Sequence, residues 1–73
     1  MIEVRLFATL REGRGKIVKL DFKTNFNGIQ LLEDLKIPQE QVSIFLINGH
    51  HQSFEKLLSD EDIVSIFPPV GGG

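Results

Sequence analysis

The stretch Ile2-Glu3-Val4-Arg5-Leu6-Phe7-Ala8-Thr9-Leu10 decides the fold, because apolar side chains occupy every second position from Ile2 to Leu10. This period of two is typical of a β-strand that packs one face on a hydrophobic core. Phe7 departs from the pattern, since it is a large apolar residue on the polar side. The sequence therefore predicts a first strand with an additional aromatic ring on its outer face.

A second strand follows this first one. Residues 11–15 are polar and rich in glycine, which favours a loop, and alternation of apolar and polar residues resumes over residues 16–23. The loop is short. We therefore expect the first two strands to pair as an antiparallel hairpin.

One helix is predicted from about residue 27 to residue 36, with apolar positions at helical spacing at Ile29, Leu32 and Leu35. Its possible N-caps are Thr24, Asn25 and Asn27. Pro38 ends the helix, because a proline disfavours the helical conformation of the residue before it. Residues 38–41 should form a loop or a single turn.

The second half of the chain contains further strands. Residues 42–47 are almost continuously apolar, which predicts a strand that is central in the sheet and covered on much of both faces. Asn48-Gly49 is a strong signal for a tight turn, so residues 50–53 should return as a short strand. Residues 63–67 should form the last strand, which leads straight into the tail.

Two strands, a helix and two or three more strands predict an α+β fold of the β-grasp type. We expect a mixed sheet of four or five strands, with one main helix packed on one face. The first and last strands can lie side by side in parallel, because a long connection separates them. Residues 1–67 would form the domain, and residues 68–73 a flexible tail.

Length and composition exclude several classes of function. A chain of 73 residues has room for one small core but not for an enzyme cavity as well. It has no cysteine, which excludes disulfides and thiolate catalysis and suits the cytoplasm. Its net charge is −2 and it has neither a basic run nor a long apolar segment, so we expect no nucleic acid and no membrane as a partner. We also expect no targeting leader before the first strand.

The chain ends in Pro68-Pro69-Val70-Gly71-Gly72-Gly73. The prolines cannot extend a strand ladder, and glycines let a backbone enter a narrow channel without side chains. A glycine tail can also be an inert extension. The stiff spacer directly after an apolar strand favours the functional interpretation, in which the terminal carboxylate is the reactive group.

Three segments resemble the MoaD/ThiS family of ubiquitin-like sulfur carriers: residues 7–12 (Phe-Ala-Thr-Leu-Arg-Glu), Asn48-Gly49, and residues 58–73 with their ending Phe-Pro-Pro-Val-Gly-Gly-Gly. The resemblance covers nearly the whole chain. The ending is more similar to the MoaD branch, the small subunit of molybdopterin synthase, than to the thiamine-pathway ThiS branch. Gly71 departs from the family pattern, which has a variable small residue before a final glycine pair.

The resemblance implies that Gly73 is adenylated by an E1-like enzyme that uses ATP. A sulfurtransferase system would then convert it to a thiocarboxylate, which donates sulfur in molybdopterin biosynthesis. Adenylation gives a poor electrophile a good leaving group, so the chemistry needs no catalytic side chain of the carrier and no bound cofactor. The tail (Gly72, Gly71, Val70, Pro69 and Pro68) would thread into the active site of a large catalytic subunit.

A partner-docking surface is predicted around Phe7, which the strand pattern places on the outer face. Phe45 and Phe67 would share that face if the strands are in register, and Arg11 and Asp62 match charged positions of the family. The alternatives are that Phe45 and Phe67 point into the core, and that residues 60–62 are only a solvated acidic turn.

The two adjacent histidines of the sequence give little information about function. Adjacent strand residues point to opposite faces, so His50 and His51 do not suggest a metal site. Two other classes of function remain open besides a molybdopterin-type carrier. The chain could be a thiamine-type carrier or a ubiquitin-like modifier that is conjugated through Gly73, or a β-grasp binding module with an inert tail.

Overall fold

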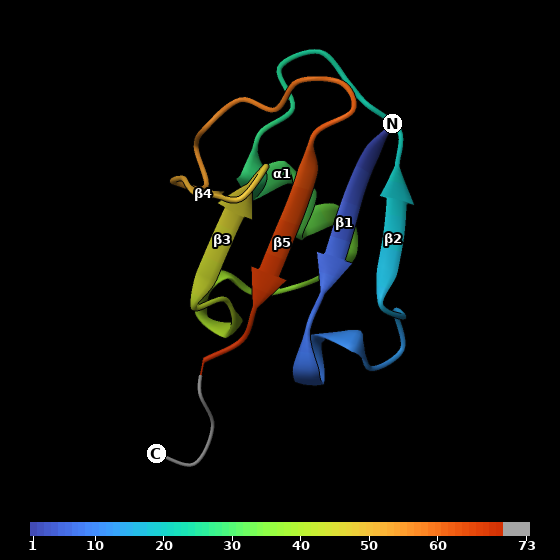
Figure 1. Cartoon of the computed structure of the whole chain (residues 1–73), viewed down its shortest axis with the longest axis vertical. Helices are drawn as coiled ribbons and strands as arrows, with labels where there is room; N and C mark the ends of the chain where they lie inside the picture. The colour runs from blue at the N-terminus through green and yellow to red at the C-terminus, as the bar shows by residue number, and fades with distance from the viewer. Residues whose placement is uncertain (70–73) are drawn as a thin grey trace.

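Five strands form one mixed sheet in the order β2-β1-β5-β3-β4 (Figure 1). The computed structural model describes residues 1–69. The strands are β1 (Ile2–Leu6), β2 (Ile17–Leu20), β3 (Ile44–Ile47), β4 (His50–His51) and β5 (Ile63–Phe67). The helical segments are α1 (Gly28–Leu35) and two single 3-10 turns, η1 (Ala8–Arg11) and η2 (Gln39–Gln41). This is the predicted β-grasp arrangement.

The strand pairing agrees with the sequence. β1 pairs antiparallel with β2, with Val4 opposite Val18, and parallel with β5, with Val4 opposite Val64. β3 pairs antiparallel with both β5 and β4. The parallel pairing of β1 with β5 brings the first and last strands side by side at the centre of the sheet.

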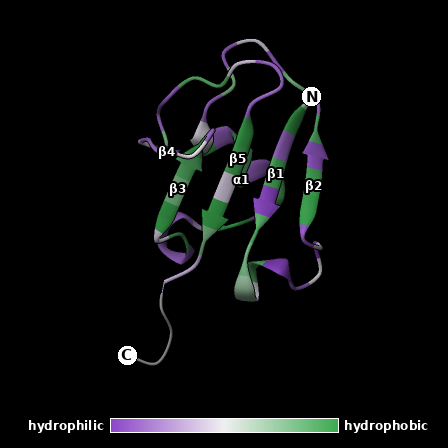
Figure 2. Cartoon of the chain, viewed as in Figure 1, coloured by the Kyte–Doolittle hydropathy of each residue, from purple (hydrophilic) through white to green (hydrophobic). Residues whose placement is uncertain are grey.

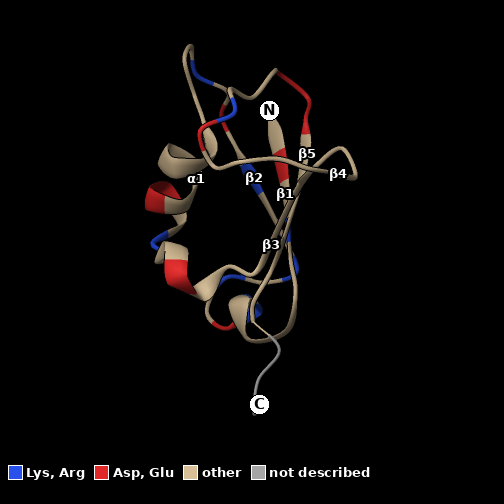
Figure 3. Ribbon diagram, turned by 90° about the vertical axis from the view of Figure 1, so that its left-hand side faces the viewer, with Lys and Arg blue, Asp and Glu red and all other residues tan. Residues whose placement is uncertain are grey.

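The hydrophobic core lies between one face of the sheet and α1, which covers that face (Figure 3). Apolar residues recur along β1, β2, β3 and β5 in Figure 2, and the buried ones at alternate positions of β1, β3 and β5 face the helix. The buried apolar residues are Ile2, Val4, Leu6, Leu10, Phe26, Leu31, Leu32, Ile37, Phe45, Ile47, Leu58, Val64 and Ile66. No described helix is long and apolar enough to cross a membrane.

The helix has the predicted start. The side chain of Asn27 accepts a hydrogen bond from the Gln30 backbone N–H at 2.9 Å, and the Gln30 side chain accepts one from the Asn27 N–H at 3.0 Å. This reciprocal capping box satisfies two N–H groups that would otherwise lack partners. Lys36 ends the helix in the left-handed conformation.

Two predictions about the strands are wrong. β1 stops at Leu6, because Ala8 takes a positive φ of 53° and starts η1, from which Leu10 still reaches the core. Leu10 is therefore a core residue, as the apolar pattern indicated, but it reaches the core from a 3-10 turn and not from a strand. β3 lies inside the sheet between β5 and β4, but its outer face is not covered as predicted and leaves Ile44 38% exposed.

Arg14 ties η1 to the end of α1. Its guanidinium donates hydrogen bonds to the carbonyls of Leu10, Leu35 and Lys36 at 3.1 to 3.2 Å. The carbonyls at a helix C-terminus lack partners within the helix, so this contact satisfies two groups at the end of α1. It connects the turn that follows β1 to the C-terminal end of α1.

Candidate functional site

The last strand delivers the tail at one end of the sheet. The carbonyl of Phe67 accepts a hydrogen bond from the Ser43 backbone N–H at 2.8 Å, and Phe67 lies opposite Ile44. Pro68 is half-buried and Pro69 is exposed, so the chain leaves the sheet at these two prolines. Val70, Gly71, Gly72 and Gly73, to which we assigned the tail chemistry, lie outside the described residues.

An aromatic stack stands at the base of the tail. The rings of Phe7 and Phe67 are 4.1 Å apart between centroids and nearly parallel, at 9°. The Arg11 guanidinium lies over the Phe7 ring at 5.4 Å from its centroid, and Arg11 Nε donates to the Leu6 carbonyl at 2.8 Å. Phe7 and Phe67 are both half-buried, so part of each ring is accessible to a partner.

We call Phe7, Phe67, Arg11 and Ile44 the tail-base patch. Ile44 belongs to it because it lies opposite Phe67 on the outer face of the sheet and is 38% exposed. The sequence analysis missed Ile44, because residues 44–47 are all apolar and no alternation shows which of them face outward. An exposed apolar cluster with one cation at its edge is suited to bind a protein.

Phe45 does not share this face, and the prediction that it does is wrong. Phe45 is 5% exposed and points into the core, where its ring packs edge-on against Phe54 at 5.1 Å between centroids. The reason is register. Phe45 lies opposite Ile66, a core residue of β5, whereas Phe67 lies opposite Ile44.

Asp62 lies at the opposite end of β5 from Phe67, so the structure does not bring it to the tail-base patch. Its Oδ1 accepts a hydrogen bond from Asn48 Nδ2 at 2.8 Å, and its Oδ2 accepts one from the Ser59 backbone N–H at 2.8 Å. Asn48 Oδ1 in turn accepts from the Ile63 N–H at 2.9 Å. Asp62 therefore connects the acidic turn to the β3–β4 turn.

The shifted ionisable groups also lie outside the patch. A hydrogen bond from the Met1 ammonium group at 2.6 Å lowers the pKa of Asp60, and the same contact raises the pKa of that ammonium group. On the outer face, a hydrogen bond from Arg5 at 2.7 Å lowers the pKa of Glu3. Both are surface ion pairs.

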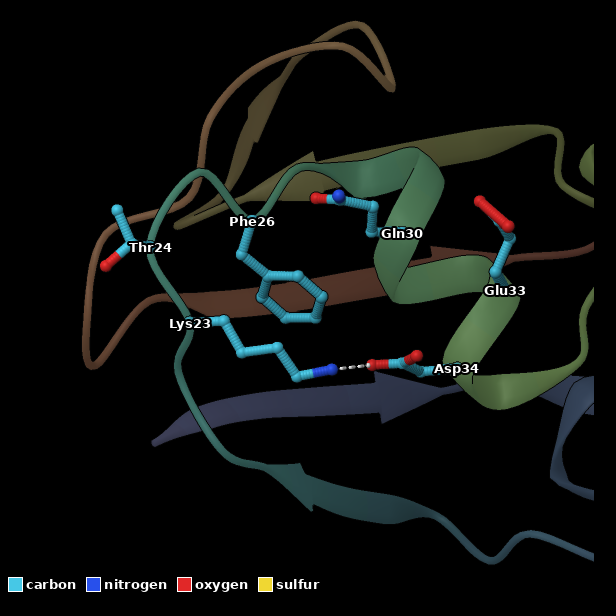
Figure 4. Close-up of a pocket in the computed structure, with 6 residues that line it drawn as sticks. All are labelled: Lys23, Thr24, Phe26, Gln30, Glu33 and Asp34. Atoms are coloured by element: carbon cyan, nitrogen blue, oxygen red, sulfur yellow. Dashed lines mark hydrogen bonds and ion pairs between the residues drawn. The ribbon is translucent and has the colours of Figure 1, made fainter.

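The described residues contain no group of three side chains placed to hold a metal ion. His50 and His51 are exposed on the short strand β4. One shallow pocket lies between α1 and the loop before it, where Lys23 pairs with Asp34 at 2.8 Å (Figure 4). It is built by neither β5 nor η1, so it is separate from the tail.

The family model described as ThiS family matches residues 4–73, which include the whole tail. None of the curated protein sequences matches the chain significantly. Among solved structures, small archaeal modifier protein 1 of Haloferax volcanii superposes with a TM-score of 0.79, with 94% of this chain and 97% of that chain covered. At 21% identity this likeness concerns the fold alone.

Two other structures are more similar in sequence. The HVO 2177 protein of Haloferax volcanii is 29% identical with a TM-score of 0.77, and the match covers 99% of this chain and 85% of that chain. A chain in the complex of subunits 1 and 2 of the molybdopterin-converting factor from Helicobacter pylori is 26% identical. Its TM-score is 0.61, and the match covers 99% of this chain and 97% of that chain.

Proposed function

The chain belongs to the ThiS family, and we propose that it is a sulfur carrier whose terminal carboxylate at Gly73 is converted to a thiocarboxylate. The observation that supports this most is the continuity of β5 with the tail. β5 is the middle strand of the sheet, its last carbonyl is held by Ser43, and the next residues are Pro68 and Pro69. A reactive C-terminus that directly follows a strand held in the middle of the sheet suits a carrier that presents this end to other enzymes.

The chemistry begins with ATP on an E1-like adenylating partner. An oxygen of the Gly73 carboxylate attacks the α-phosphorus of ATP, and pyrophosphate leaves. A sulfur atom at the oxidation level of hydrosulfide, supplied by a sulfurtransferase, then attacks the acyl carbon, and AMP leaves with the former carboxylate oxygen. The product is a thiocarboxylate, and one proton is released. The carrier supplies the acyl group and needs no base of its own.

The partner that consumes the sulfur would be a larger catalytic subunit. The similar Helicobacter pylori chain comes from a complex of subunits 1 and 2 of the molybdopterin-converting factor. We propose a corresponding complex here, for molybdopterin or a related tungsten cofactor, in which the tail-base patch docks and the tail enters the partner's active site. Phe7 and Phe67 supply apolar contact area, and Arg11 suits a carboxylate of the partner.

Intact mass spectrometry of the protein isolated from its native host tests the proposal. A thiocarboxylate raises the mass by the difference between one sulfur and one oxygen atom. A protein modifier would instead appear as much heavier conjugates, and an inert tail would appear at the unmodified mass in every preparation.

A reconstitution experiment supplies the control. The cognate adenylating enzyme should release pyrophosphate from ATP with the full chain but not with a chain lacking Gly72 and Gly73. Pyrophosphate release that survives this deletion contradicts the proposal. Sulfur transfer to a molybdopterin precursor, against transfer to a thiazole precursor, then separates the molybdopterin pathway from the thiamine pathway.

A further inference from the structure

The turn between β3 and β4 consists of an asparagine followed by a glycine, Asn48-Gly49, and both residues are exposed. They take positive φ values of 51° and 84°, as a tight turn of this kind requires. The turn lies beside the start of β5, where the Asn48 backbone N–H donates to the Ile63 carbonyl at 2.7 Å (Figure 1). The Asn48 side chain is held there as well: Oδ1 accepts from the Ile63 N–H at 2.9 Å, and Nδ2 donates to Asp62 Oδ1 at 2.8 Å.

An exposed Asn-Gly pair can lose ammonia in a reaction between its two residues. The backbone nitrogen of Gly49 attacks Cγ of Asn48, a new C–N bond forms, and a cyclic succinimide results. The bond from Cγ to Nδ2 breaks, and the proton of the Gly49 N–H leaves with that nitrogen as ammonia. Water then opens the ring at either carbonyl, which gives aspartate or isoaspartate at position 48. Glycine favours the attack because no Cβ shields its nitrogen.

We propose that Asn48-Gly49 is a site of spontaneous deamidation, and that the hydrogen bonds of Asn48 to Asp62 and Ile63 hold the reaction back. Cγ reaches the Gly49 nitrogen when the side chain turns back onto its own backbone, and this rotation breaks both side-chain hydrogen bonds. The bond to Asp62 has a charged acceptor, which makes it the stronger of the two. Deamidation therefore proceeds in molecules whose β3–β4 turn has opened locally.

Deamidation would also remove the contact that held it back. An aspartate at position 48 places a second carboxylate where Nδ2 now donates to Asp62, and two carboxylates at that distance repel each other. Isoaspartate instead adds a methylene group to the backbone of a turn whose length sets the register of its strands. Either product loosens the attachment of the β3–β4 turn to β5, so a modified molecule opens more readily than an unmodified one.

Asn27-Gly28 is the other Asn-Gly pair of the chain and provides an internal comparison. Gly28 is buried, and the Asn27 side chain accepts a hydrogen bond from the Gln30 N–H at the start of α1. Aspartate is as good an N-cap as asparagine, and its charge suits the N-terminus of a helix. The change from asparagine to aspartate should therefore destabilise the domain at position 48 but not at position 27.

Mass spectrometry of the full chain, followed by peptide mapping, tests the proposal. Deamidation replaces an amino group by a hydroxyl group, and isoaspartate peptides separate from aspartate peptides. Incubation in buffer is compared with incubation in urea at the same mildly alkaline pH and the same temperature. We expect Asn48 to deamidate at least about tenfold more slowly in the folded chain. Equal rates under the two conditions overturn the proposal.

Two variants of the acidic turn separate the local contact from general stability. Asp62→Ala should raise deamidation of Asn48 in the folded chain about fivefold and leave Asn27 unchanged. Asp60→Ala, which removes a carboxylate of the same turn that does not bond to Asn48, should change the rate less than about twofold. No acceleration by Asp62→Ala, or equal acceleration at Asn27, overturns the proposal.

If Asp62→Ala does not fold, variants that mimic the aspartate product provide the test. Asn48→Asp should melt several degrees below the wild type, whereas Asn27→Asp should melt at the wild-type temperature or above it. An Asn48→Asp protein that melts with the wild type overturns the proposal.

Discussion

Gly28 should be required at the start of α1, even though alanine is the better helix former. Helix propensity alone favours Gly28→Ala by up to about 1 kcal/mol. The structure reverses this expectation. A Cβ at position 28 would lie 2.7 Å from Cζ of Phe45 and 2.7 Å from the Phe54 carbonyl oxygen, both far inside van der Waals contact. Gly28 is buried, so the added methyl group has no open space to enter.

The size of the effect depends on which neighbour can move. The Phe45 ring can shift only within a packed core, and the Phe54 carbonyl is held by the Ile29 N–H at 3.0 Å. Overpacking of this kind costs about 1–3 kcal/mol, and a weakened backbone hydrogen bond adds about 1 kcal/mol. After the gain in propensity, we expect Gly28→Ala to lower the free energy of unfolding by about 2 kcal/mol. For a domain of this size the melting temperature then falls by roughly 8–16 °C.

Urea unfolding and thermal melting followed by circular dichroism measure this change. Gly13→Ala is the matched control, because Gly13 has a φ of +71° but nothing within 4 Å of a new Cβ. It should cost only the left-handed backbone penalty, about 1 kcal/mol. Adding Phe45→Leu to Gly28→Ala should recover part of the loss. A Gly28→Ala protein as stable as the wild type would refute the close-approach argument.

Three further predictions concern the surface and the turns. Phe7→Ala should weaken binding to the cognate large subunit more than it lowers the melting temperature, because both stacked rings are only half-buried; a large thermal loss with unchanged binding contradicts a docking role. Ala8→Gly should raise the free energy of unfolding by about 1 kcal/mol in urea, since Ala8 has a φ of 53°, and a drop would mean that its methyl group matters more than its backbone. The lowered pKa of Glu3 means that its contribution to stability is present above its unfolded pKa, near 4.5, and is lost as the pH falls through its folded pKa. Glu3→Gln should therefore flatten the acid limb of the stability–pH curve, and an unchanged limb would exclude this ion pair as its cause.

Local signals in the sequence were sufficient for most of the elements. The helix start near Asn27, the Asn48-Gly49 turn and the strand at residues 63–67 each depend on residues that are close in the chain, so the sequence predicted them where the structure has them, although Asn27 was one of three possible N-caps. The apolar-polar pattern also identified Phe7 as a residue of the outer face. The resemblance of residues 7–12, 48–49 and 58–73 pointed to the family, and the ending in three glycines is the basis of the role proposed for Gly73.

Contacts between segments that are distant in the sequence decided which residues form the tail-base patch and which belong to the core. The register of β3 against β5 turned Phe45 into the core and placed Ile44 beside Phe67. Hydrogen bonds across the acidic turn gave Asp62 a structural contact instead of a place in the patch. The close approach of Phe54 made Gly28 a packing requirement, although by propensity it is a weak residue for a helix. Each outcome depends on which distant segment of the chain lies next to a given side chain. The order of residues along the sequence does not contain that information.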